Sequence, residues 1–478
     1  MGVIDDMKLF MEPRSVAIIG ASRSTSNDGF FNSLECLREL QYPGGIYPIN
    51  PSTDEILGLT AYPSVTQAPD GIDLAMITVP RHAVLPAVRE CLEKGIRAMI
   101  VVTQGFADAD ETGKALQDEL LRVTRAAGAR VLGPNTMGVF NAYSRFSSAF
   151  VSLVKPDRKL PSGFIGQSGF ATYLGLLTRP LGVPWIGAKG IDVGNACDVD
   201  QADALEYLAA DPETKVIALH LEGVKDGRRF VEVASRASRV KPVLAVKVGT
   251  TECGARAVAS HTGSIVGQDQ VYDAVMRQAG IIRVADLEEL EDLTKAFATL
   301  PPLKGKRIAV LTPVGGLGVM AADACGYHGL EMASFTPATM ERLTALFPEW
   351  MSFGNPLDVW PAAFSVSYPQ VFHMMGEAVL EDPNVDGVMC VVYSALIGYS
   401  FFEPLEEIND LVSRYNKPIT AYVYGPRCQD GASKLEEPGK IAAYPSPVRA
   451  VRALGALWKY QLLQQRSVIS NQLSAISF

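Results

Sequence analysis

The sequence lacks any apolar run close to the roughly 18 residues that a membrane-spanning helix needs. Its hydrophobic stretches are short, and residues 98–102 (AMIVV) are typical of the longest. The chain does not open with a basic segment followed by an apolar one, and Asp6 stands where a myristoylation signal would need Ser or Thr. We therefore expect no targeting segment and no membrane contact.

Paired cysteines and an excess of positive charge are also missing. The seven cysteines are widely spaced with no C-x-x-C pair, which indicates neither a zinc site nor a disulfide framework and favours a reducing cytoplasm. With 43 basic against 52 acidic residues, the net charge of −9 argues against nucleic acid or an anionic membrane as a partner.

Length and periodicity predict three α/β domains. At about 150 residues per domain, 478 residues correspond to about three. Short β-branched runs alternate with longer amphipathic ones, which is typical of βα units around parallel sheets. Proline-containing stretches at residues 152–163 and 298–306 interrupt this pattern. We predict domains over residues 1–145, 155–300 and 304–462, followed by a loosely held tail over 463–478.

The first domain is expected to be Rossmann-like, with an anion-binding loop at residues 20–29 (GASRSTSNDG) after its first strand. Small residues there would let backbone N–H groups approach a phosphate at a helix N-terminus. Ser22 stands at the second glycine position of G-x-G-x-x-G, and the second strand ends in Asn50 rather than an acid. NAD is therefore disfavoured, and an ordinary βα turn remains an alternative.

The second and third domains are predicted to be two related flavodoxin-like domains, because each begins with a strand that runs into a turn of small residues. In the second domain this turn contains Gln167, Ser168 and Gly169, which could donate hydrogen bonds to a phosphoryl group. In the third domain it spans residues 315–318 (GGLG). A tight turn without a ligand is the alternative in both places. Asp358 in the segment NPLD is interpreted as a turn former rather than a functional acid.

Of the five histidines, only His261 is surrounded by small polar residues, in the segment ASHTGS. We expect an exposed imidazole in a loop, which suits a phosphate carrier. Such a carrier needs a carboxylate on its second ring nitrogen, and Glu222, at a predicted strand end, is the candidate. His82, His220, His328 and His373 are assigned to packing or solvation.

In their order, these segments resemble the NDP-forming acyl-CoA synthetases, the group that contains ADP-forming acetyl-CoA synthetase and succinyl-CoA synthetase. The resemblance covers about residues 5–460. It is carried by VAIIGAS, YPINP, TVP, GPNTMG, GQSG, DVGNACDVD, LEG, ASHTGS, GGLGV and NPLD.

The resemblance implies a ligase that makes an acyl-CoA from a carboxylic acid and coenzyme A through an acyl phosphate. By the same resemblance, His261 is the phosphorylated histidine, Glu222 orients it, and the turn of Gln167, Ser168 and Gly169 receives the phosphate. The implied coenzyme A site is formed by Gly20, Ala21, Ser22, Arg23, Val79, Pro80 and Asn135.

The same family needs an ATP-grasp domain to charge the histidine, and we find no such segment in these 478 residues. We therefore expect ATP or ADP and Mg²⁺ to bind a separate β-type subunit, in a hetero- or homo-oligomer. Two other functions stay open: a coenzyme A-binding regulatory protein without turnover, and an NAD(P)-dependent oxidoreductase. Trp185, Phe353 and Trp360 would suit a larger acid, although such residues more often pack in a core.

Overall fold

The computed structural model describes residues 2–24, 32–150, 158–169, 185–262, 268–364, 366–395 and 402–476. The chain divides into two compact units. The first comprises residues 1–178 and 185–290, and the second comprises residues 179–184 and 291–478. Among the described residues, no helix is both long and apolar enough to cross a membrane.

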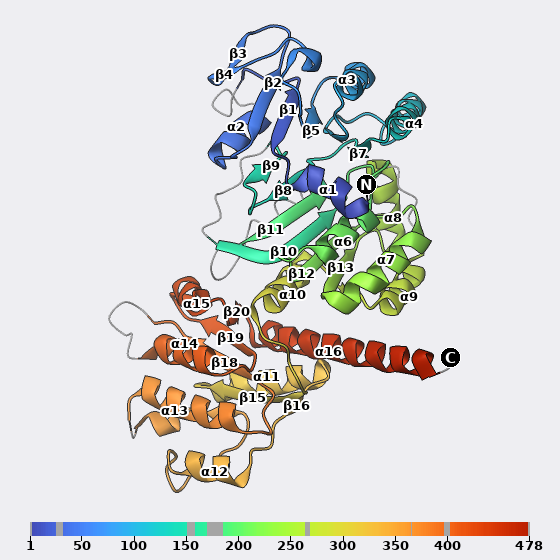
Figure 1. Cartoon of the computed structure of the whole chain (residues 1–478). Coiled ribbons are helices and arrows are strands. Elements are labelled where there is room, and N and C mark those ends of the chain that lie inside the picture. Colours follow the sequence, from blue (N-terminus) through green and yellow to red (C-terminus); the bar gives the residue numbers. More distant parts are fainter. Residues whose placement is uncertain are drawn as a thin grey trace. The chain divides into compact units, whose positions relative to one another are not determined.

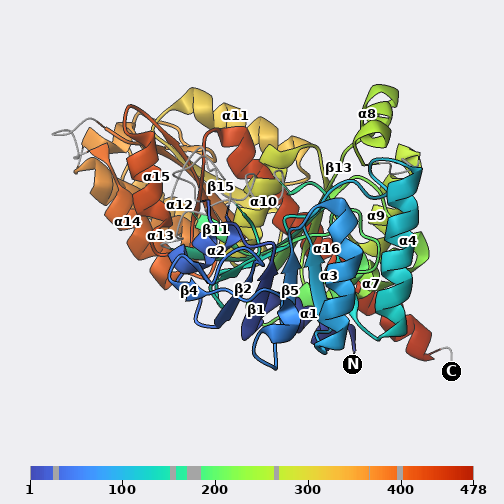
Figure 2. The same cartoon turned by 90° about the horizontal axis from the view of Figure 1, so that it is seen from above.

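The first sheet is parallel and supplies the N-terminal half of the first unit. Its strand order is β2 (Gly45–Ile49), β1 (Ser15–Ile19), β5 (Leu74–Ile77), β6 (Ala98–Val101) and β7 (Arg130–Leu132). The surrounding elements are α2 (Ser33–Glu39), β3 (Glu55–Ile56), β4 (Leu59–Thr60), the 3₁₀ turn at Val65–Gln67, α3 (Arg81–Glu93) and α4 (Glu111–Ala126). Figure 2 shows α3 and α4 side by side, and α3 packs against β5. Every residue of β1, β5 and β6 is buried, as expected for a parallel sheet covered on both faces.

The second sheet lies in the same unit and mixes five parallel strands with two antiparallel ones. Its order is β14 (Ile282–Val284), β13 (Val243–Lys247), β12 (Val216–Leu221), β10 (Arg158–Gly166), β11 (Trp185–Asp192), β8 (Val139–Asn141) and β9 (Phe146–Ser147). Its helices are α6 (Gln201–Ala210), α7 (Gly227–Val240), α8 (Glu252–Thr262) and α9 (Asp269–Ala279). The N-terminal helix α1 (Val3–Met11) packs against α6 (Figure 1) and buries Met7, Phe10 and Met11 in the core.

The second unit contains one parallel sheet, ordered β16 (Glu331–Met332), β15 (Arg307–Thr312), β18 (Gly387–Tyr393), β19 (Ile419–Tyr424) and β20 (Ala442–Tyr444), with β17 (Leu357–Asp358) beside β15. The other elements are α10 (Leu287–Thr299, in this unit from Glu291), α11 (Gly315–Tyr327), α12 (Pro337–Thr344), the 3₁₀ turn at Pro361–Phe364, α13 (Tyr368–Glu381), α14 (Leu405–Arg414), α15 (Cys428–Glu436) and α16 (Pro447–Ile476). Helices α11 and α16 pack against each other (Figure 1).

The predicted fold class is confirmed, because the five main parallel strands of each sheet, with β17 left out, follow the order 2-1-3-4-5 when numbered within that sheet. Several local predictions differ from the structure. The predicted boundary at residue 145 falls between β8 and β9, which both belong to the second sheet. The segment at 152–163, where we predicted the start of a new domain, already contains the start of β10. Helix α16 continues through the predicted tail as far as Ile476.

Candidate functional site

The carboxyl ends of four neighbouring strands lie side by side in the second sheet and bring two of the predicted residues, Gln167 and Glu222, into contact. In the order β11, β10, β12 and β13, these strands end at Asp192, at the turn Gln167–Gly169, before Glu222, and before the segment that leads into α8. Parallel strands place their carboxyl ends at one edge of a sheet, where α/β proteins bind ligands. Gln167 and Glu222, 55 positions apart in the chain, therefore meet at this edge.

Gln167 and Glu222 are linked directly. The Gln167 side-chain oxygen accepts hydrogen bonds from the backbone N–H groups of Glu222 at 2.8 Å and Gly223 at 3.0 Å. Glu222 is 4% exposed, and Lys247 donates from Nζ to its backbone oxygen at 2.9 Å. The turn after β10 is thus fixed to the end of β12, and the Gln167 amide nitrogen is left as the donor group of that side chain.

Asp192 is a further candidate site residue, and it was not predicted from the sequence. Its carboxylate is buried and accepts from the backbone N–H groups of Met137 at 2.8 Å and Gly194 at 3.2 Å. Burial raises its pKa to about 6, and the charge of Glu222 adds to the increase. A Cβ atom on Gly169 would lie 3.0 Å from its Oδ2 atom. The signal that the sequence offered was its position as the first acid of the segment DVGNACDVD.

The prediction that His261 lies in a loop is wrong for the residues that precede it. Residues Glu252–Thr262 form α8, and His261 lies in its last turn. The segment ECGARAVASHT contains three alanines and an arginine, which are good helix formers, and these outweigh the small residues that indicated a loop. The side chain of His261 and residues 263–267 lie outside the described part of the structure.

The carboxyl edge of the first sheet gathers the residues assigned to coenzyme A. Gly20 has a φ of +89°, and a Cβ atom there would lie 2.9 Å from Val79 Cγ1. Thr103 connects Val79 with Asn135, because its hydroxyl donates to the Val79 backbone oxygen at 2.7 Å and its own carbonyl accepts from the Asn135 N–H at 3.1 Å. Thr103 was not singled out from the sequence, although it is the polar residue that ends the run AMIVV.

The loop after β1 differs in part from the predicted anion cradle. The N–H groups of Gly20 and Ala21 donate to the Ile49 carbonyl at 3.0 and 3.3 Å, so they shape the turn instead of facing a ligand. Asn50, which follows β2, donates from its side chain to the Ala21 carbonyl at 2.9 Å. Ser22 is half-buried and Arg23 is exposed, while residues 25–29 of the predicted loop lie outside the described residues.

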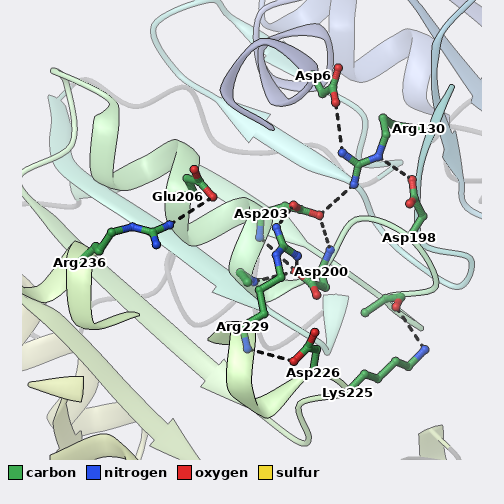
Figure 3. Close-up of polar contacts among 12 residues, drawn as sticks. Asp6, Arg130, Asp198, Asp200, Asp203, Glu206, Lys225, Asp226, Arg229 and Arg236 are labelled. Atoms are coloured by element: carbon green, nitrogen blue, oxygen red, sulfur yellow. Dashed lines mark hydrogen bonds and ion pairs between the residues drawn. The ribbon is translucent and has the colours of Figure 1, made fainter. Parts of the chain in front are cut away.

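The segment after Asp192 is anchored by two arginines, as Figure 3 shows. Arg130 contacts Asp6 at 3.2 Å, Asp198 at 2.8 Å and Asp203 at 3.0 Å. Arg229 contacts Asp203 and, at 3.0 Å, Asp200. These ion pairs join α1, β7, α6 and α7 around DVGNACDVD, so the acids at its end are structural. Lys225 also binds this segment, by donating to the backbone oxygen of Asn195 at 2.7 Å.

Other candidates have structural uses. Asp358 accepts from the Trp360 N–H at 3.1 Å, as expected of a turn former. His220 is buried in β12, and burial lowers its pKa, while His373 contacts Asp410 at 2.9 Å. Among the described residues, no group of three or more His, Cys, Asp or Glu side chains could hold a metal ion.

Two protein families match the first unit. Residues 14–142 match the CoA binding domain, and residues 161–297 match the succinyl-CoA ligase like flavodoxin domain. The chain thus combines a coenzyme A-binding domain with a ligase-type flavodoxin domain, which defines a coenzyme A-dependent acid–thiol ligase.

Similar proteins cover nearly the whole chain. It is 38% identical to Acetate--CoA ligase [ADP-forming] II of Archaeoglobus fulgidus, over 96% of this chain and 67% of that protein. It is 36% identical to the alpha subunit of the Pyrococcus furiosus enzyme II, over 94% of this chain and 96% of that subunit. Among solved structures, the dinucleotide-forming acetyl-coenzyme A synthetase 1 of Ca. Korarchaeum cryptofilum, in complex with phosphate and ADP, matches with a TM-score of 0.85 at 33% identity, over 97% of this chain and 98% of that one.

The chain belongs to the family of ADP-forming acetate–CoA ligases. It is an ADP-forming acid–thiol ligase of the α-subunit type. It spans about two thirds of the length of the Archaeoglobus fulgidus relative. The oxidoreductase alternative was wrong.

Proposed function

We propose that this chain carries the acyl and phosphoryl transfer steps of the ligase, with His261 as the transiently phosphorylated residue. The observation that carries the proposal is the hydrogen-bonded pair of Gln167 and Glu222 at adjacent strand ends, beside the strand that leads into α8. A buried carboxylate that accepts from an imidazole N–H fixes the tautomer and leaves the other ring nitrogen as the nucleophile. Glu222, at 4% exposure, has this role.

The turn Gln167–Gly169 receives the phosphoryl group at the N-terminal end of the segment that follows β10. Helix N-termini and amide donors stabilise anions. In the acyl-CoA-forming direction, phosphohistidine transfers its phosphoryl group to the carboxylate of the acid, which gives an acyl phosphate and neutral imidazole. The coenzyme A thiol then attacks the acyl carbon, so that the thioester forms, inorganic phosphate leaves, and the thiol proton is released.

Coenzyme A binds at the carboxyl edge of the first sheet, against Ser22, Arg23, Val79, Pro80 and Asn135. Gly20 and Ala21 shape the turn that presents Ser22 and Arg23. ATP or ADP and Mg²⁺ bind a separate β-type subunit of a cytoplasmic complex, in keeping with the relatives named as alpha subunits. The relatives named for acetate make a small carboxylic acid the first substrate to test.

The test uses the reverse half-reaction, which needs no nucleotide. Full-length protein is mixed with acetyl-CoA and ³²P-phosphate, and acid-labile, base-stable label on the protein is measured with release of free thiol. Wild type and His373→Ala should be labelled, because His373 is a partly exposed histidine of the second unit, paired with Asp410. His261→Ala should not be labelled, and Glu222→Gln should be labelled more slowly. Equal labelling of His261→Ala and wild type would disprove the assignment.

A further inference from the structure

Asp192 lies between two turns that the proposed reaction uses for different substrates. On the coenzyme A side, its Oδ2 atom accepts from the Met137 N–H at 2.8 Å, and its own N–H donates to the Gly138 carbonyl at 2.8 Å. On the phosphate side, Asp192 pairs in register with Gly166, and the next residue, Val193, donates to the Gly166 carbonyl at 2.9 Å. Asp192 is therefore hydrogen-bonded to the turn that contains Met137 and Gly138, and it lies beside the turn that follows Gly166.

The two turns are also in direct contact at Gly169. A Cβ atom there would lie 2.6 Å from Met137 Cγ and 3.0 Å from Asp192 Oδ2, distances shorter than a normal contact. A side chain at position 169 would therefore displace Met137 and press on the carboxylate of Asp192. A shift of Met137 would be transmitted to the phosphate-side turn, because little space is left between them.

Burial of the ionised Asp192 carboxylate at this position costs folding free energy. Asp192 is 1% exposed, and this burial is the main cause of its raised pKa. The carboxylate is stabilised by hydrogen bonds from the backbone N–H groups of Met137 and Gly194. Burial of an ionised carboxylate costs more folding free energy than burial of a neutral amide of the same shape. Its advantage is that both of its oxygens accept, so that both backbone N–H groups are satisfied.

We propose that Asp192 is a positioning residue that fixes the Asn135–Gly138 turn against the Gln167–Gly169 turn, so that the coenzyme A thiol and the phosphoryl group are aligned for transfer. The inference rests on the proposed function of these two turns. Asp192 itself contacts no reacting atom in this proposal. It acts through the backbone of Met137 and the space left by Gly169.

Asp192→Asn tests the proposal because it keeps the shape but provides only one acceptor oxygen. The amide NH₂ group must then face a backbone N–H group, so one of the two bonds is lost. The matched control is Asp382→Asn in the second unit. Asp382 is also 1% exposed, and it accepts from the backbone N–H groups of Thr336 at 2.8 Å and Asn384 at 2.7 Å. Both variants lose the same kind of bond.

The single-turnover rate of labelling by acetyl-CoA and ³²P-phosphate is measured at saturating concentrations, together with the Kd for coenzyme A. For Asp192→Asn we expect the rate to fall on the order of 10- to 100-fold, since small misalignments have effects of this size. The Kd should stay within about twofold, because four of the five proposed coenzyme A contacts, Ser22, Arg23, Val79 and Pro80, lie outside the turn that Asp192 holds. Asp382→Asn should retain the wild-type rate.

The outcomes separate this inference from the proposed function. Absence of label on the wild-type protein would disprove the proposed function itself. Labelling of the wild type together with an Asp192→Asn rate that equals that of Asp382→Asn would overturn only the positioning role. An equal loss in rate and in coenzyme A affinity would likewise overturn it, because it would show a damaged binding site rather than misalignment.

Discussion

Replacement of Arg130 by alanine should destabilise the first unit more than any exposed ion pair would. Arg130 contacts Asp6, Asp198 and Asp203, and the side chains of Asp198 and Asp203 are only 5% and 2% exposed (Figure 3). Removal of the guanidinium group leaves the carboxylates of Asp198 and Asp203 buried without this cation. Loss of one partner of a buried pair costs about 3–5 kcal/mol. Because Asp203 keeps Arg229 and Asp198 keeps a longer contact with Arg125, we expect about 3 kcal/mol.

Urea unfolding of the full chain, followed by circular dichroism, measures this loss. Arg122→Ala is the matched control, because Arg122 contacts Glu119 at 2.7 Å while the two side chains are 67% and 33% exposed. An exposed pair contributes under about 1 kcal/mol. If Arg130→Ala loses no more stability than Arg122→Ala, the structural role assigned to the acids of DVGNACDVD is wrong.

Three further predictions concern the two sheet edges. Burial raises the pKa of Asp192 from 3.8 to about 6, so its ionisation opposes folding, with no penalty below pH 3.8 and the full penalty above pH 6. The stability of Asp192→Asn relative to wild type should therefore increase by about 1.4 kcal/mol from pH 5 to pH 8 in urea unfolding, and a constant difference would contradict this. Gly20→Ala should weaken coenzyme A binding about tenfold in calorimetry, because the new Cβ meets Val79 at a φ of +89°, whereas Gly58→Ala, at a φ of +77° with nothing within 4 Å, should bind normally. Gln167→Met should lose about 1–3 kcal/mol of stability, because two backbone N–H groups lose their acceptor, and retention of wild-type stability would refute that role.

The sequence predicts those elements whose local pattern agrees with the final fold. The buried runs of β1, β12 and β18 are β-branched and short, so they were recognised as strands of parallel sheets. By contrast, β11 (WIGAKGID) contains two glycines and a lysine, and no local pattern predicts it. It is a strand because it pairs with β10, and its Lys189 is 1% exposed against Asp211 at 2.7 Å.

The candidate site shows the same division. Gln167 and Glu222 could be selected because each follows a predicted strand, and carboxyl ends gather at one edge. Their mutual hydrogen bond could not be predicted, since it requires the register of β10 beside β12. Asp192 was missed because its partner Met137 is 55 positions away and bonds through the backbone, which no sequence pattern records. The loop predicted at His261 failed because helix propensity in residues 252–262 outweighed the small residues.

The central claim, that His261 carries the phosphoryl group, is tested most directly by locating the phosphate on the protein. Full-length protein is incubated with acetyl-CoA and inorganic phosphate at neutral pH and digested without acid, and the phosphopeptides are identified by tandem mass spectrometry. We predict a single phosphohistidine at residue 261, and no phosphopeptide from His261→Ala. Phosphate on another residue, or an unchanged phosphopeptide pattern in the variant, would contradict the account.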